Sequence, residues 1–111
     1  RRSSDLQIEQ VLINLIKNAK ESCGQNTAPQ IEVELEQVPG KVCSLTVRDN
    51  GEGILPEVID KVFVPFFTTK PSGSGIGLSL CKQIMNLHGG TITVSSEIGK
   101  GSCFTLMFPG R

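Results

Sequence analysis

The sequence contains no tryptophan or tyrosine and has five phenylalanines among its 111 residues. A surface that stacks nucleic-acid bases needs aromatic side chains, and one that follows a phosphate backbone needs an excess of basic residues. Here eleven basic residues balance eleven acidic residues, so the formal net charge is zero. The composition therefore argues against nucleic acid or an anionic membrane as the partner.

Long hydrophobic runs and metal-binding spacings are also missing. No apolar segment approaches the roughly 20 residues that cross a bilayer, and no signal-peptide pattern is present. Cys23, Cys43, Cys81 and Cys103 form no C-x-x-C pair, and the chain has one histidine, which argues against the usual zinc sites. A disulfide is one alternative. Each cysteine lies in or beside an apolar run, however, which favours reduced thiols and a reducing, cytosolic setting.

The residue patterns predict one domain, residues 1–111, with the element order α-β-β-α-β-β. Apolar residues at helical spacing predict two long amphipathic helices, and alternating residues predict two hairpins. The segment LPEVIDKVF predicts a further short helix, with a proline near its start. We expect an α+β fold, a two-layer α/β sandwich in which helices cover one face of a mixed, largely antiparallel sheet. The predicted helices span 3–24 and 76–90, and the predicted strand regions span 28–38, 42–49 and 91–109.

The segment DNGEGI, residues 49–54, directly follows the second predicted strand. Asp-Asn-Gly is strong turn chemistry, so a hairpin turn is one interpretation. A binding loop is the other, because glycine lets the backbone approach a ligand closely. These six residues alone leave both interpretations open.

Two other polar features need an explanation. Asn14 and Asn18 lie one turn apart inside the first predicted helix, where the simplest interpretation is two solvated side chains at the edge of the apolar stripe. The segment GSGIGL, residues 73–78, closes a loop and opens a helix, whose first N–H groups can bind phosphate. Lys70 on that loop is a candidate phosphate partner. No strand precedes the glycines, and no P-loop pattern occurs, which argues against a dinucleotide site.

These features together match one kind of ligand. A carboxylate at a strand end can accept a hydrogen bond from the exocyclic amine of a base. Side-chain oxygens on a helix suit Mg²⁺, which shares its coordination with phosphates and water. A glycine-rich helix start can hold a polyphosphate. The combination predicts Mg-ATP.

Five motifs in order then carry a family resemblance over nearly the whole chain: NLIKNA, DNGEGI, FVPFF, GSGIGLSL and GKGSCFTLMFP. The chain resembles the catalytic, ATP-binding domain of sensor histidine kinases of two-component systems. Its loop is similar to that of short-lid kinases of the nitrogen-regulation and sporulation type. The resemblance implies a Bergerat-type ATP-binding fold, with ATP and Mg²⁺ as ligands.

The resemblance implies roles for single residues around the base and the metal. Asn18 is expected to coordinate Mg²⁺, and Asn14 to support the metal and phosphates from one turn earlier. Asp49 is expected to bond the amino group of adenine. Three further residues are expected to shape the base pocket, namely Gly51, Gly53 and Ile54.

Other roles concern the lid and the far wall of the site. Phe63, Phe66 and Phe67 are expected to anchor the lid, and Ser102 to lie near the nucleotide. Lys70 gains weight as a phosphate ligand because Glu21 stands where many family members carry a basic residue. The remaining nucleotide-binding positions lie where the lid meets the second helix, at Gly73, Gly75, Ile76, Gly77 and Leu78.

The implied reaction is transfer of the γ-phosphoryl group of Mg-ATP to a histidine on a separate dimerisation domain, expected before Arg1, with a response regulator downstream. The domain itself is expected to be monomeric, without direct membrane contact. Two alternatives remain. One is an ATPase switch of the gyrase or MutL class, which places a glutamate base where this chain has Asn14, a side chain unable to take a proton from water. The other is a degenerate module that uses the fold for protein contact. His88 is expected to be structural.

Overall fold

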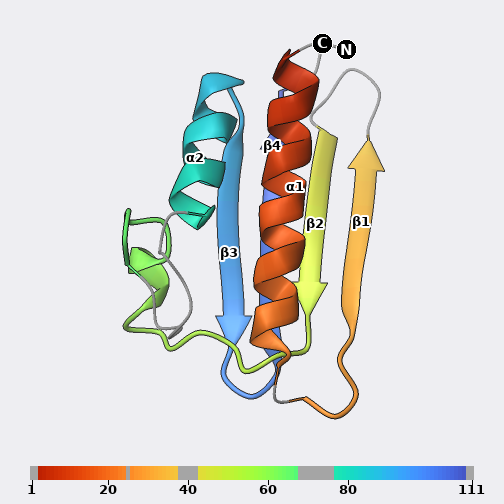
Figure 1. The fold of residues 1–111 in the computed structure, drawn as a ribbon, viewed down its shortest axis with the longest axis vertical. Helices are drawn as coiled ribbons and strands as arrows, with labels where there is room; N and C mark the ends of the chain where they lie inside the picture. Colours follow the sequence, from red (N-terminus) through yellow and green to blue (C-terminus); the bar gives the residue numbers. More distant parts are fainter. Residues whose placement is uncertain (1–2, 25, 38–42, 68–76, 110–111) are drawn as a thin grey trace.

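The computed structural model describes residues 3–24, 26–37, 43–67 and 77–109. Two long helices lie side by side on one face of a four-stranded sheet (Figure 1). Along the chain, the described elements follow the predicted order, and a short 3-10 helix lies between the two hairpins. The two-layer α+β sandwich is therefore confirmed.

The sheet has the strand order β1-β2-β4-β3. All three pairings among the described strands are antiparallel, so this part of the expected mixed, largely antiparallel sheet has no parallel pair. The central pairing of β2 with β4 sets Asp49 directly opposite Ser102, although 53 residues separate them. The strands are β1 Ile31–Gln37, β2 Cys43–Asp49, β3 Thr91–Glu97 and β4 Gly101–Phe108.

The first helix, α1 (Ser3–Ser22), follows the predicted apolar stripe over most of its length. Val11 and Leu15 are fully buried, because side chains four residues apart lie on one face of a helix. Leu6 is an exception: it is 56% exposed and lies outside the buried stripe. The second helix, α2 (Gly77–Leu87), covers the neighbouring part of the sheet (Figure 1). No helix of the described part of the chain is long and apolar enough to cross a membrane.

The core lies between the helices and one face of the sheet. Successive residues of a strand point to opposite faces, so each central strand contributes every second residue to the core. Val47 of β2 and Phe104 and Leu106 of β4 are almost fully buried on this covered face. Their neighbour Arg48 lies on the opposite, open face and is exposed.

The outer strand β1 is less buried than its alternating sequence predicts. Val33 and Leu35 are 49% and 63% exposed, although they share the covered face of the sheet with Val47. The reason is the position of α1, which contacts β2 more than β1 and leaves the edge strand uncovered (Figure 1).

The short helix predicted over LPEVIDKVF is confirmed only in part. The segment forms successive tight turns, with a 3-10 helix only at Ile59–Lys61. Its backbone bonds include Lys61 N–H to Val58 O at 2.8 Å and Val64 N–H to Lys61 O at 3.0 Å, both three residues apart. The segment is rich in β-branched residues, whose stiff side chains lower helix propensity, and no side chain caps its start.

Candidate functional site

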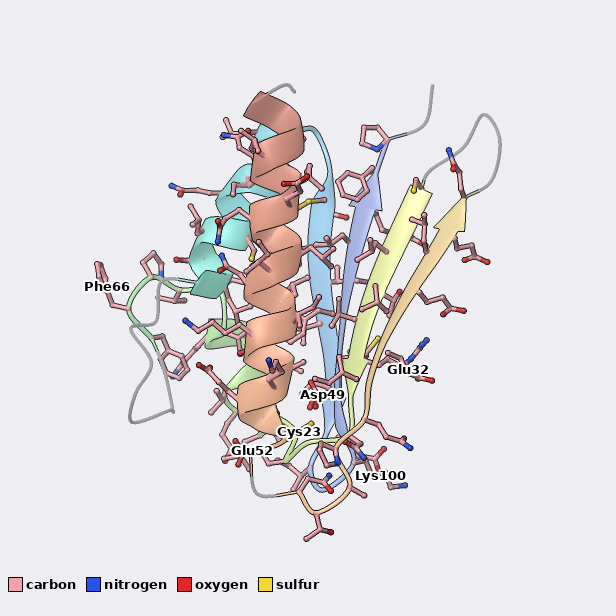
Figure 2. The ribbon with its side chains drawn as sticks, turned by 45° about the vertical axis from the view of Figure 1, so that its right-hand side comes forward. Cys23, Glu32, Asp49, Glu52, Phe66 and Lys100 are labelled. Atoms are coloured by element: carbon pink, nitrogen blue, oxygen red, sulfur yellow. The ribbon has the colours of Figure 1, made fainter. Side chains whose placement is uncertain are left out.

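Asp49 lies at the end of β2, beneath the C-terminal end of α1 (Figure 2). Its side chain is buried, with the residue 8% exposed, and Oδ1 accepts hydrogen bonds from two backbone groups. These are Gly51 N–H at 2.9 Å and Ser102 N–H at 3.3 Å. Both donors bind the same oxygen, so Oδ2 is the oxygen left to accept from a ligand. The carboxylate is thus held in one orientation by the backbone on either side of it.

The glycine loop after Asp49 is packed tightly against two other parts of the chain. A Cβ on Gly51 would overlap the carbonyl of Ser22 at the end of α1, and a Cβ on Gly53 would lie 2.5 Å from Glu97 O. Gly53 also has a φ of 81°, which favours glycine. Glu52 N–H donates to Ser22 O at 3.2 Å, which fastens the loop to the helix. The glycines therefore let this loop approach protein backbone as well as a ligand.

Ser102 and Ser96 complete a group that we call the strand-end cluster: Asp49, Gly51, Ser96, Gly101 and Ser102. Ser102 is 4% exposed, and its Oγ lies 3.0 Å from Ser96 Oγ on the neighbouring strand β3. Ser96 was missed by the sequence prediction. The Gly-Lys-Gly turn contained a usable signal, because the hairpin register around it pairs Ser96 with Ser102.

Asn50, which sequence reasoning also missed, fastens the chain segment between α1 and β1 to the end of β2. Its Oδ1 accepts from Gln30 N–H at 2.8 Å, and its Nδ2 donates to Ala28 O at 3.0 Å. Asn26 Nδ2 donates in turn to the Asn50 carbonyl at 2.7 Å. The asparagine of DNGEGI therefore has a structural role, while the aspartate remains available to a ligand.

Two of the predicted metal and phosphate residues, Asn14 and Asn18, lie on the side of α1 that faces α2. Asn14 Nδ2 donates to Gly77 O, the first residue of α2, at 3.5 Å, and its Oδ1 accepts from Gln10 Nε2 at 3.2 Å. Asn18 is half-buried one turn further along the same side. Asn14 therefore contacts the helix start that the sequence singled out, which the interpretation as two solvated side chains does not predict.

Cys81 is a buried residue of α2 whose side chain points toward α1. It has no exposed surface, and its Sγ donates to Val11 O at 3.7 Å. Burial raises the pKa of the Cys81 thiol from 9.0 to about 11, and a hydrogen bond with Asn14 partly opposes that shift. All four cysteines are free thiols, so the prediction of reduced cysteines is confirmed.

The three phenylalanines of FVPFF behave differently. The ring of Phe63 stands edge-on to Phe104 with centroids 6.2 Å apart, and Lys82 Nζ lies 5.3 Å from its centroid. Phe67 is half-buried. Phe66 is 75% exposed, has a φ of 69° and points away from the molecule (Figure 2). Phe63 is therefore an anchor to the core, whereas Phe66 does not pack on the core. Because residues 68–76 lie outside the described residues, the expected anchoring of the lid by these rings stays a prediction.

The remaining predicted positions divide into two groups. Ile54 and Leu78 are half-buried and pack against the core, and Gly77 is exposed at the start of α2. The other four lie outside the described residues, so their predicted roles stay predictions: Lys70, Gly73, Gly75 and Ile76.

A metal would have few protein ligands here. Among the described residues, no group of three His, Cys, Asp or Glu side chains could hold an ion. The amide oxygen of Asn18 is a hard donor of the kind Mg²⁺ accepts when substrate phosphates complete its coordination. This donor set therefore fits magnesium bound together with a nucleotide, and does not fit a closed structural metal site.

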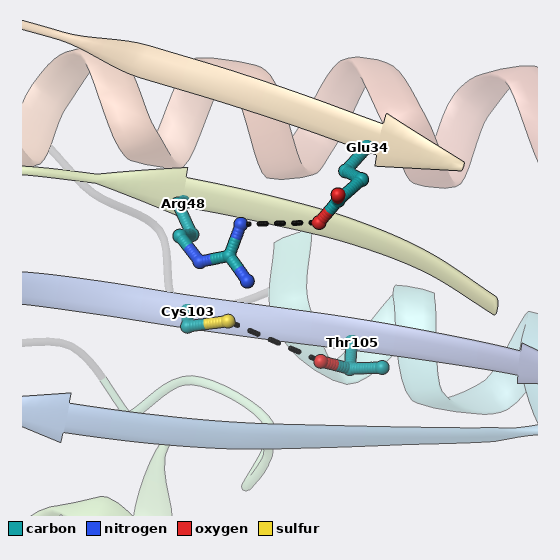
Figure 3. A network of polar contacts seen from close by, with 4 residues as sticks. All are labelled: Glu34, Arg48, Cys103 and Thr105. Carbon is teal, nitrogen blue, oxygen red and sulfur yellow. Dashed lines mark hydrogen bonds and ion pairs between the residues drawn. The ribbon is translucent and has the colours of Figure 1, made fainter. Parts of the chain in front are cut away.

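The open face of the sheet carries a second polar group, which we call the open-face network: Glu34, Arg48, Cys103 and Thr105 (Figure 3). Arg48 Nη1 lies 3.3 Å from Glu34 Oε1, with side chains 49% and 65% exposed. Cys103 Sγ and Thr105 Oγ1 are 4.0 Å apart. These contacts are long and solvated, so this face offers weaker chemistry than the strand-end cluster.

Residues 3–111 match the family described as histidine kinase-, DNA gyrase B-, and HSP90-like ATPase. The sensor histidine kinase ZraS of Escherichia coli (strain K12) is 41% identical over 102 residues, covering 92% of this chain and 21% of ZraS. The chain thus spans about a fifth of that relative's length.

Two solved structures show the same fold. The nucleotide-free catalytic domain of the histidine kinase ThkA superposes with a TM-score of 0.80 at 38% identity, covering 94% of this chain and 66% of that one. Full-length ShkA in complex with AMPPNP superposes with a TM-score of 0.81 at 26% identity, covering 93% of this chain and 21% of that one. The likeness extends over nearly all of this chain in both cases.

Proposed function

This chain belongs to the family of histidine kinase-, DNA gyrase B-, and HSP90-like ATPases, as the catalytic domain found in sensor histidine kinases, and we propose that it binds Mg-ATP for phosphoryl transfer to a histidine. The observation that carries the proposal is the fixed carboxylate of Asp49. Oδ1 is held by Gly51 and Ser102, and Oδ2 is left to accept from a ligand. Such an oxygen can accept a hydrogen bond from the exocyclic amine of a nucleobase, and adenine carries such an amine.

The surroundings of Asp49 support a planar, partly apolar ligand. Ile54, half-buried at the end of the glycine loop that follows Asp49, offers an apolar side chain. Its backbone N–H is already bound by Ser96 Oγ at 2.7 Å, so the loop is fixed before any ligand arrives. A fixed loop lowers the ordering cost of binding.

The phosphates are proposed to lie toward the α1–α2 pair. Asn14 connects α1 to the first residue of α2, and Asn18 follows one turn later. Mg²⁺, when bound, neutralises phosphate charge and orients the γ-phosphoryl group. Lys70 is proposed as an additional cation on the phosphates, from its place in the sequence.

The proposed reaction needs no base from this chain. A neutral imidazole nitrogen on the acceptor domain uses its lone pair to form the N–P bond, while the bond from the γ-phosphorus to the bridging oxygen breaks and ADP leaves. The chain contributes position and electrostatics, which are the main sources of catalysis in phosphoryl transfer. Because this chain spans about a fifth of ZraS, the acceptor domain and a downstream response regulator are proposed as parts of a longer system.

An ATPase switch is the main rival, and Asn14 argues against it. A hydrolytic enzyme needs a group that takes a proton from water, whereas an amide cannot do so. The Asn14 amide is moreover occupied, donating to Gly77 O and accepting from Gln10. This arrangement favours a positioning role.

The test is a transfer assay with ATP labelled on its γ-phosphate. The chain is mixed with a separately produced helical phosphoacceptor domain from a sensor histidine kinase, and with the same domain carrying glutamine at its acceptor histidine. The proposal predicts label on the histidine form only, and little free phosphate without acceptor. Steady phosphate release by the chain alone would support the ATPase switch, and absence of both nucleotide binding and transfer would support the degenerate module.

A further inference from the structure

Ser96 connects the two walls of the proposed base pocket. Its Oγ accepts from Ile54 N–H at 2.7 Å, which fixes the wall formed by the glycine loop. It also contacts Gly101 O at 2.9 Å and Ser102 Oγ at 3.0 Å, which belong to the wall formed by the sheet. Ser102 then reaches Asp49 through its backbone N–H. One hydroxyl group therefore joins the loop, the hairpin and the carboxylate.

Counting protons at Ser96 fixes the direction of each bond. A serine hydroxyl has one proton to donate and two lone pairs to accept with. The Gly101 carbonyl can only accept, so the Ser96 proton goes there. Ile54 N–H can only donate, so it takes one lone pair. Ser102 must then donate its own hydroxyl proton to the remaining lone pair, and its oxygen is left as an acceptor.

We propose that Ser96 is a positioning residue for nucleobase recognition. It acts through Ser102, whose hydroxyl it orients, and through Ile54, whose backbone it fixes. The inference rests on the proposed function, because it assumes that Asp49 reads an amino group on the base. Without the Ser96 hydroxyl, Ile54 N–H loses its partner and the Ser102 hydroxyl can rotate. The pocket then discriminates less between a base that carries the amino group and a base that lacks it.

The experiment measures the binding of two ligands to this chain with Mg²⁺ present. ATP carries the 6-amino group, and purine riboside triphosphate lacks it but keeps the ribose and phosphates. The test variants are Ser96→Ala, which removes the hydroxyl, and Ser96→Thr, which keeps it. The matched control is Ser95→Ala, because Ser95 is the exposed neighbour on the opposite face of β3.

The wild type is expected to bind ATP at least about tenfold more tightly than the deaminated analogue, as the loss of a hydrogen bond to a carboxylate implies. Ser96→Ala is expected to weaken ATP binding by about three- to tenfold. It is also expected to reduce the preference for ATP by about the same factor, while Ser96→Thr and Ser95→Ala keep the wild-type ratio. A purely structural role would weaken both ligands equally and leave the ratio unchanged, which would overturn the proposal.

The design separates this proposal from the proposed function. If the wild type binds neither ligand, or binds both ligands equally, amine recognition by Asp49 is contradicted. The proposed function and the Ser96 proposal then both fail. A wild type that prefers ATP, together with a Ser96→Ala variant of unchanged preference, contradicts the Ser96 proposal alone. If Ser96→Ala does not fold, Ser96→Cys supplies the same test, because sulfur fills the space but accepts hydrogen bonds weakly.

Discussion

The strand-end cluster and the open-face network share the central strands β2 and β4, where Asp49 adjoins Arg48 and Ser102 adjoins Cys103 in sequence. Asp49 and Ser102 are buried on the covered side, whereas Arg48 is exposed and Cys103 is half-buried on the open face. The cluster contains contacts of 2.9 to 3.3 Å, and the network has contacts of 3.3 and 4.0 Å. The two groups are both polar, and they differ in burial and in the length of their contacts. Exclusion of water strengthens each polar contact and raises the cost of losing it.

The largest effect is expected from adding a methyl group inside the strand-end cluster. In Gly101→Ala the new Cβ would overlap the carbonyl of Asp49, and φ at this position is 129°. We expect a loss of about 3 kcal/mol or more in the free energy of unfolding. Gly99→Ala is the control, because φ is 81° there but nothing lies within 4 Å of the added Cβ, so about 1 kcal/mol is expected. Equal losses in urea denaturation would contradict this packing argument.

The next effect is a loss of stability as the pH rises, expected from the buried thiol of Cys81. Cys103, on the open face, serves as the control. The folded chain holds the pKa of Cys81 at about 11, above its ordinary value of 9.0, so the unfolded chain loses its proton first. Stability from this group is complete below pH 9 and falls between pH 9 and 11, by up to about 1.4 kcal/mol per pH unit. Thermal unfolding should show a weaker pH dependence in Cys81→Ala. The wild-type dependence should persist in Cys103→Ala, and identical profiles for both variants would contradict the assignment.

A smaller effect is expected at Asn50, which borders the strand-end cluster. Asn50→Ala removes its bonds to Gln30 and Ala28, and we expect a loss of about 1 to 3 kcal/mol in the free energy of unfolding. Asn50→Asp keeps an acceptor for Gln30 N–H but loses the amide donor, so its loss should be smaller. If aspartate proved as harmful as alanine, the bond to Gln30 would not be the important one.

The smallest effect is expected in the open-face network. Glu34→Gln removes the charge opposite Arg48, but both side chains are about half exposed or more. We expect a change below about 0.5 kcal/mol in the free energy of unfolding, and one that shrinks further in high salt. A change of the size expected for Asn50→Ala would remove the contrast between the two regions.

Much of this fold follows from local sequence patterns. The helix and strand periodicities predict every long element, and the turn residues predict both hairpins. The pattern could not show that α1 leaves β1 uncovered, so Val33 and Leu35 are more exposed than alternation implies. The position of a helix across a sheet depends on the packing of the whole core, which no single segment contains.

The candidate site was predictable where one motif supplies a residue, and less so where two strands meet. Asp49 was singled out because its carboxylate stands beside glycines at a strand end, and its role as a ligand stays a prediction. Ser96 was missed: the hairpin register pairs it with Ser102, but its bond to Ile54 in the glycine loop depends on the tertiary fold. The motif FVPFF likewise could not show that Phe63 packs on Phe104 while Phe66 is 75% exposed.

Calorimetric titration with ATP in the presence of Mg²⁺ tests the central claim most directly, when applied to the wild type and to two neighbouring variants. Asp49→Ala removes the buried carboxylate, and Arg48→Ala removes its exposed neighbour on the opposite face. We expect micromolar-range binding by the wild type, affinity within about twofold in Arg48→Ala, and a loss of at least about thirtyfold in Asp49→Ala. Unchanged affinity in Asp49→Ala would contradict the assignment of the base-binding site.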